Sequence, residues 1–260
     1  MPTFNANGTE IYYQEEGEGF PLVLLHGLTS NSEMFRHEID KFKKNYRVIA
    51  PDARGHGNSE KPPHYELKDH IGDVISLVDH LGLDSFHLIG VSMGSYIAQG
   101  VAIEMGDRVK KLVLVATKSH GEQASMEELY ERHADEMEGK TPIDKMVAAT
   151  KYMFHNRKAV RKWLHETAEN SEQLTLHEQA IASKALEGFD FREDLHRIKA
   201  EALIISGLHD GLNPSDYGEE TAQLIPASVF LEFKLSGHAP NVEQPVLFME
   251  VVSNFLESKD

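Results

Sequence analysis

The chain has 260 residues, of which 40% are hydrophobic, and its formal net charge is −16. This length can bury the core of one sizeable domain, and the acidic charge argues against nucleic acid or anionic membrane surfaces as partners. The absence of cysteine excludes disulfides, thiolate zinc sites and cysteine nucleophiles, and it suits a cytoplasmic location. We expect neither a secretory signal nor a membrane span, because the first residues lack a leader pattern and the apolar runs are only strand length.

Strands and helices alternate in the first part of the chain. Apolar runs, or alternation of polar and apolar residues, predict strands over 9–14, 21–25, 46–50 and 111–117 and in the run from residue 86 into Ser92. Apolar residues at helical spacing predict helices over 32–42, 67–81 and 96–105. This regular order predicts a mostly parallel central sheet with helices on both faces, whose site lies at the carboxyl ends of the strands.

The segment Gly90-Val91-Ser92-Met93-Gly94 lies between a predicted strand and a predicted helix. A Gly-x-Ser-x-Gly pattern at such a junction indicates a sharp turn, with the serine at its apex in a strained conformation. A side chain two residues to either side would collide with the turn, which explains both glycines. By chance the pattern occurs in about one chain in ten of this length, so its meaning depends on the other motifs.

The alternation of strands and helices stops over residues 119–187, where no strand is predicted. Amphipathic helical segments are predicted over 126–138, 143–155, 159–167 and 172–186. We interpret 119–187 as a helical cap insertion whose inner face lines the substrate pocket, and 1–118 with 188–260 as the core domain. The alternative is that its apolar residues only hold these helices to one another.

The strand pattern resumes after residue 188. Strands are predicted over 202–207 and 228–233, with helices over 215–224 and through 246–255. Asp210 and His238 follow these two strands, so both should reach the edge of the sheet where Ser92 lies. A serine nucleophile needs a base and an acid that orients the base, and the order Ser92, Asp210, His238 supplies both. The backbone N–H groups of Leu28 and Met93 are the expected oxyanion donors.

Five motifs resemble those of the α/β-hydrolase superfamily, and the resemblance covers essentially the whole chain. They are the His-Gly oxyanion loop, the Asp-x-Arg-Gly-His-Gly-x-Ser turn, the nucleophile elbow, the acid loop and the histidine-containing ending, at residues 25–27, 52–59, 90–94, 207–214 and 237–245. The sequence looks most like small single-cap carboxylesterases, 3-oxoadipate enol-lactonase-like hydrolases and cofactor-free haloperoxidase or perhydrolase relatives. Serine at the elbow separates it from haloalkane dehalogenases and epoxide hydrolases.

The resemblance implies a serine hydrolase that cleaves small to medium carboxylic esters or lactones through an acyl-enzyme, without a cofactor. No metal is expected, because the histidines show no metal-binding spacing. The same triad could instead carry perhydrolysis, thioester cleavage or carbon–carbon hydrolysis. The chain could also be a non-catalytic ligand-binding receptor on this fold. The sequence leaves homo-oligomerisation open.

Other polar residues near the expected site are interpreted as structural. His26 and His56 are expected to hold the loops at the edge of the sheet. Asp52 and Arg54 are expected to pair with each other and shape their turn. Ser95 is expected to serve as a small packing residue.

Three further candidates lie close to the proposed acid or to the elbow in sequence. His209 adjoins Asp210, but an extended loop would point it the other way. Asp216 is an alternative acid, although its position favours the first turn of a helix. Asp84 precedes the elbow strand and therefore lies at the wrong end of the sheet.

Overall fold

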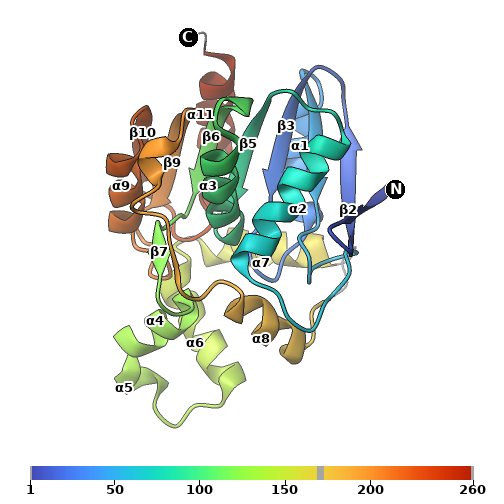
Figure 1. Ribbon diagram of the computed structural model, residues 1–260. Coiled ribbons are helices and arrows are strands. Elements are labelled where there is room, and N and C mark those ends of the chain that lie inside the picture. The colour runs from blue at the N-terminus through green and yellow to red at the C-terminus, as the bar shows by residue number, and fades with distance from the viewer. Residues whose placement is uncertain (1, 169–172, 259–260) are drawn as a thin grey trace.

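The computed structural model describes residues 2–168 and 173–258, and an eight-stranded sheet forms its centre (Figure 1). The strands are β1 (Thr3–Ala6), β2 (Thr9–Glu16), β3 (Phe20–Leu25), β4 (Tyr46–Pro51), β5 (Phe86–Val91), β6 (Val109–Val115), β9 (Glu201–Gly207) and β10 (Ser228–Phe233). Their order is β1-β2-β4-β3-β5-β6-β9-β10. The pairs from β4 to β10 are parallel, whereas β1 and β2 are added antiparallel.

Helices cover both faces of the sheet. They are α1 (Arg36–Phe42), α2 (Leu67–His80), α3 (Met93–Met105), α9 (Ser215–Leu224), α10 (Pro240–Glu243) and α11 (Pro245–Glu257). In β3, Val23 and Leu25 pack with α2 and α3, while Leu22 and Leu24 pack with α1 and α11. This coverage explains the absence of polar alternation in β3 and confirms the predicted fold class. In the described ranges, no helix is both long and apolar enough to cross a bilayer.

Three elements differ from the sequence-based expectations. β1 was not predicted, because its four residues form a strand only by pairing with β2. The helix expected from residue 32 begins as a 3₁₀ turn, η1 (Ser32–Phe35). The predicted last helix corresponds to α11, but the short helix α10 that precedes it was not predicted. Proline has no N–H and clashes with the preceding turn, so it starts a new helix rather than continuing one.

The chain leaves the sheet after β6 and forms a group of helices, most of which Figure 1 shows below the sheet. They are α4 (Ser125–Arg132), α5 (Ala134–Met137), α6 (Pro142–Met153), α7 (Arg157–Ala168) and α8 (Leu176–Lys184). A two-residue strand, β7 (His120–Gly121), pairs with β8 (Phe189–Asp190). The expectation of no strand in 119–187 is therefore wrong for β7, which is too short to leave a pattern. The first residue of the helix predicted over 172–186 lies outside the described residues.

Candidate active site

β5 turns into α3 at Ser92, which has φ 52° and ψ −119°. Residues with side chains rarely adopt positive φ, so the surrounding structure must hold this turn. The Ser92 N–H donates to the carbonyl of Val115 at 2.8 Å. A Cβ at Gly90 would overlap the carbonyl oxygen of Gly94, and a Cβ at Gly94 would overlap that of Leu25. Glycine is thus required at both positions. At Gly90 the turn itself leaves no room for a side chain, and at Gly94 the end of β3 approaches too closely.

The structure brings together the three side chains that follow three different strands. His238 Nε2 lies 2.9 Å from Ser92 Oγ, and His238 Nδ1 lies 2.8 Å from Asp210 Oδ2. The Asp210 side chain is fully buried, and its Oδ1 accepts from the backbone N–H groups of Leu212 and Asn213 at 2.9 and 3.0 Å. A carboxylate accepts a hydrogen bond from the Nδ1–H group, which leaves Nε2 as an acceptor facing Ser92.

The loop after β3 lies against the elbow. A Cβ at Gly27 would be 3.5 Å from Ser92 Cβ, and Leu28 comes next in this loop. The following residue, Thr29, has a strained φ of 62°. Met93 begins α3, where N–H groups have no acceptor within the helix. Among the described residues, neither the Leu28 N–H nor the Met93 N–H donates to a protein acceptor.

Two buried histidines hold the neighbouring loops, as expected. His26 Nε2 accepts from the Ala53 N–H at 2.9 Å, and Nδ1 lies 2.8 Å from the Gly27 carbonyl. Burial lowers the pKa of His26 to about 4 and that of His56 to about 3. Both rings are therefore neutral near pH 7, and His26 joins the loop after β3 to the loop after β4.

The expected pairing of Asp52 with Arg54 is wrong. Asp52 accepts from the backbone N–H groups of Ser32 and Asn58 at 2.7 and 2.8 Å. Arg54 instead donates twice to Asp73 of α2, at 2.5 and 2.6 Å. The Arg54 guanidinium is buried and needs an ionic partner, whereas amide donors already satisfy Asp52. Only the packing of α2 on the sheet supplies that partner.

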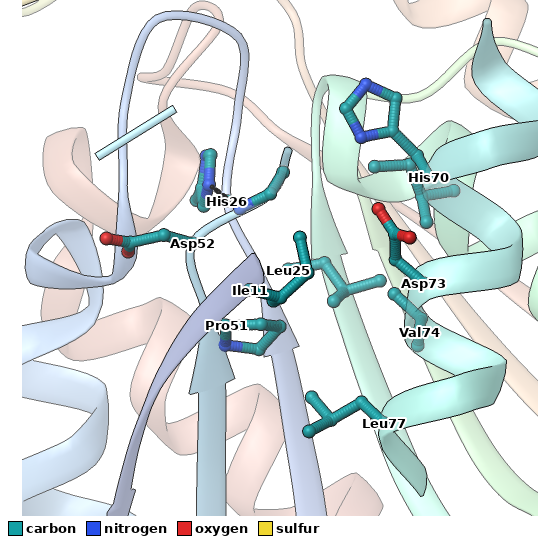
Figure 2. Close-up of a pocket in the computed structure, with 11 residues that line it drawn as sticks. Ile11, Leu25, His26, Pro51, Asp52, His70, Asp73, Val74 and Leu77 are labelled. Carbon is teal, nitrogen blue, oxygen red and sulfur yellow. Dashed lines mark hydrogen bonds between the residues drawn. The ribbon is translucent and has the colours of Figure 1, made fainter. Parts of the chain in front are cut away.

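A small, mostly apolar cavity lies beside this ion pair (Figure 2). Figure 2 shows Asp73, Val74 and Leu77 of α2 facing Leu25 and Ile11 across it. His26 and His70 also line the cavity, but Ser92, Asp210 and His238 do not. The cavity therefore belongs to the packing behind the loops rather than to the site at Ser92.

The remaining sequence candidates lie apart from the three side chains. His209 is exposed and stacks on His155, with ring centroids 4.2 Å apart. Asp216 lies in the first turn of α9, as expected, and Asp84 is exposed before β5. Ser95 does more than pack, because its Oγ donates to the Ser92 carbonyl at 2.6 Å. In residues 2–168 and 173–258, no group of three or more His, Asp or Glu side chains could hold a metal ion.

Sequence reasoning missed two residues that support the site. Asn213 Nδ2 donates to Tyr96 Oη at 2.6 Å and to the Ala116 carbonyl at 2.7 Å. Glu243 Oε1 accepts from the Gly237 and Ala239 N–H groups at 2.9 and 3.2 Å. The Glu-x-Pro after His238 was a signal for Glu243. For Asn213 the only signal was its place in the acid loop.

Comparison with known proteins gives a consistent result. Residues 21–140 match the model of the alpha/beta hydrolase fold family. The chain is 31% identical over 258 residues to 3-oxoadipate enol-lactonase 2 of Acinetobacter baylyi, covering 96% of this chain and 94% of that protein. The structure is similar to the enol-lactonase from Burkholderia xenovorans, with a TM-score of 0.83, 27% identity and coverage of 99% and 100%. It is also similar to an esterase from Exiguobacterium antarcticum, with a TM-score of 0.82, 25% identity and coverage of 97% of each chain.

Proposed function

This chain belongs to the alpha/beta hydrolase family, and on that basis we propose that it hydrolyses small to medium carboxylic esters or lactones through an acyl-enzyme on Ser92. The observation that carries the proposal is the hydrogen-bonded chain from Ser92 through His238 to Asp210, with distances of 2.9 and 2.8 Å. A serine hydroxyl is activated by an adjacent base that a third group orients, and this chain of bonds has that arrangement.

In the proposed reaction, His238 Nε2 takes the proton of Ser92 Oγ while Oγ attacks the carbonyl carbon. The N–H groups of Leu28 and Met93 stabilise the resulting oxyanion, and each such donor lowers the barrier by about 3–4 kcal/mol. The intermediate collapses, the C–O bond breaks, and the leaving alcohol takes the proton from His238. Water then repeats the sequence on the acyl-enzyme, releases the acid and restores Ser92. Asp210 remains ionised and stabilises the imidazolium throughout.

Ester and lactone substrates fit one mechanism because both contain the same acyl–oxygen bond. In a lactone the leaving alcohol remains attached to the acyl group after the bond breaks. The relatives named as enol-lactonases and as an esterase support this substrate class.

We further infer that residues 119–187 act as a cap over the site. Leu129 and Ala149 of this segment form a buried apolar cluster with Leu212, two residues beyond Asp210. The carbonyl of Met153 also accepts from the His238 N–H at 2.6 Å. The segment therefore contacts the loops that carry two of the three proposed catalytic residues, where it can select the substrate.

The decisive experiment removes the nucleophile. We expect Ser92→Ala to lower turnover of p-nitrophenyl acetate and butyrate by at least about a thousandfold. Ser253→Ala, a serine removal in α11 on the core, is the matched control and should retain full activity. Wild-type turnover by Ser92→Ala would overturn the assignment. A fluorophosphonate probe should label the folded wild type at Ser92, and absence of labelling would favour a ligand-binding role instead.

A substrate panel separates the reactions that the same triad could perform. It should compare kcat/KM for esters, lactones, thioesters and a carbon–carbon diketone substrate, together with peracid formation. We expect the highest values for esters or lactones. A rival substrate turned over far faster than these would replace the proposed reaction while leaving the assignment of Ser92 intact.

A further inference from the structure

Residues of α4 and α6 hold the acid loop from several sides. The Gly211 N–H donates to the Tyr152 carbonyl at 2.8 Å, and the Gly211 carbonyl accepts from Arg132 Nη2 at 2.5 Å. Ser125 Oγ donates to Asn213 Oδ1 at 2.9 Å. The N–H of Asn213 in turn bonds to the Asp210 carboxylate. The loop that carries the proposed acid is thus fixed between the core and the helical segment.

The histidine loop has a similar connection. The His238 N–H donates to the Met153 carbonyl at 2.6 Å. Glu243 bonds to the Gly237 N–H through Oε1 and to the Asn156 N–H, just before α7, through Oε2 at 2.6 Å. One buried carboxylate therefore joins the histidine loop to the segment that follows α6.

The last turn of α6 connects the two loops to each other. Carbonyls at the end of a helix have no partner within it and need donors from outside. Tyr152 and Met153 are consecutive, and their carbonyls accept from Gly211 and His238 respectively. A Cβ at Gly211 would lie 2.6 Å from Tyr152 O, and a Cβ at Gly237 would overlap Met153 O. The two loops also bond directly, since the His209 N–H donates to the Ser236 carbonyl at 2.9 Å. The two consecutive α6 carbonyls add a second connection between the acid loop and the histidine loop, on the side of the helical segment.

We propose that the last turn of α6, together with Ser125 and Arg132 of α4, positions the Asp210–His238 pair, so that docking of the helical segment is part of assembling the base. This inference rests on the proposed function and assigns the segment a role in proton transfer in addition to covering the substrate. Misplacing a catalytic group by about 1 Å costs roughly a hundredfold in rate. Loosening this contact should therefore lower kcat even though Ser92 itself stays in place.

The test disturbs the contact without changing the three proposed catalytic residues. Gly237→Ala introduces a methyl group against Met153 O, Arg132→Ala removes the donor to Gly211 O, and Ser125→Ala removes the donor to Asn213. We expect Gly237→Ala to lower kcat at least about tenfold and the other two variants to lower it less, with KM changing much less than kcat. Ser125→Thr keeps a hydroxyl and should restore the activity that Ser125→Ala loses.

Matched controls place the same changes elsewhere. Gly72→Ala in α2 has room for the methyl group, since its Cβ would lie 3.7 Å from Asn7 Nδ2, an ordinary van der Waals contact. Arg161→Ala removes an exposed arginine of α7. Both variants should retain wild-type kcat and KM. If Gly237→Ala does not fold, Arg132→Ala and Ser125→Ala decide the outcome, because Arg132 is partly exposed and its removal leaves no clash.

A second measurement needs no substrate. We expect the proton between His238 Nδ1 and Asp210 Oδ2, which lie 2.8 Å apart, to give a far-downfield ¹H NMR resonance. The loss of this resonance in Asp210→Asn would identify it. We expect this resonance to shift or broaden in Gly237→Ala and in Arg132→Ala, and to be unchanged in both controls. Folded Gly237→Ala and Arg132→Ala with wild-type kcat and an unchanged resonance would overturn the inference. A wild type that is neither labelled nor active would overturn the proposed function alone, since the resonance still tests the positioning.

Discussion

Ser92 is held by the sheet, whereas Asp210 and His238 are held to a large extent by the helical segment 119–187. The Ser92 N–H bonds to β6, and Gly94 packs against the end of β3. Asp210 and His238 lie on loops whose backbone groups bond to the last turn of α6. The nucleophile is therefore held by groups of the central sheet, while the base is also held by a contact between two parts of the molecule.

The two regions also differ in packing. Strand residues such as Leu24 and Leu114 are fully buried, but Ile143, Val147 and Leu176 of the helical segment are 59%, 63% and 70% exposed. Few buried contacts mean a low free energy for local opening. The segment should open more readily than the sheet, and the base should be more sensitive to that opening than the nucleophile.

The largest effect is expected when the hydrogen-bonded chain from Ser92 through His238 is broken at Asp210, its buried end. Asp210→Asn should lower kcat by about 10³–10⁴-fold, because an amide no longer holds His238 in the tautomer that accepts the serine proton. Kinetics on p-nitrophenyl butyrate measures the loss. Asp216→Asn is the matched control and should be nearly silent. The opposite pattern would make Asp216 the acid and would remove the reason to link the acid loop to α6.

The next effect compares a buried ion pair of the core with an exposed one of the helical segment. Arg54→Ala should lower the free energy of unfolding by about 3–5 kcal/mol, because it leaves the Asp73 carboxylate buried without its partner. Lys151→Ala, which removes the exposed partner of Glu136, should leave the urea midpoint almost unchanged. Equal midpoints for the two variants would contradict the difference in packing between the regions.

The smallest expected effect is a pH dependence of the free energy of unfolding, which arises from buried titratable groups of the core. Burial lowers the pKa of His56 to about 3, so its unfolded form binds a proton below about pH 6.5 while the folded form does not. Stability from this group is complete above pH 6.5 and is lost as the pH falls toward the folded pKa. The slope is about 1.4 kcal/mol per pH unit for each such histidine. Burial raises the pKa of Glu38 from 4.5 to about 7, which acts in the opposite sense, since its contribution is lost as the pH rises from about 4.5 to about 7.

Urea unfolding between pH 8 and pH 4.5 measures this dependence. His56→Asn should reduce the slope below pH 6.5, because its amide can still donate to the Arg54 carbonyl without titrating. His177→Asn, on an exposed position of α8, should leave the slope as in the wild type. A slope changed by His177→Asn but not by His56→Asn would place the acid sensitivity in the helical segment instead.

Most of the fold followed from local patterns along the chain. The continuous apolar run at 21–25, the helical spacing over 67–81 and the glycines at 90 and 94 each reflect a constraint within one or two elements. The predicted fold class and the resemblance to α/β-hydrolases are both confirmed. β7 escaped prediction because two residues carry no pattern, and the Asp52–Arg54 pairing failed because α2 offers Arg54 a better partner.

By itself, the sequence determined the elbow at Ser92 and the order in which Asp210 and His238 follow it. Such features depend on side-chain type at fixed spacing, which a sequence records directly. Only the tertiary structure decided that Arg54 pairs with Asp73 and that Tyr152 and Met153 connect the acid loop to the histidine loop. Those last contacts are made by backbone carbonyl and N–H groups, which nearly every residue carries. The positions of these contacts are therefore set by packing. In the sequence they are reflected by the glycines at 211 and 237, where a side chain would meet the Tyr152 and Met153 carbonyls.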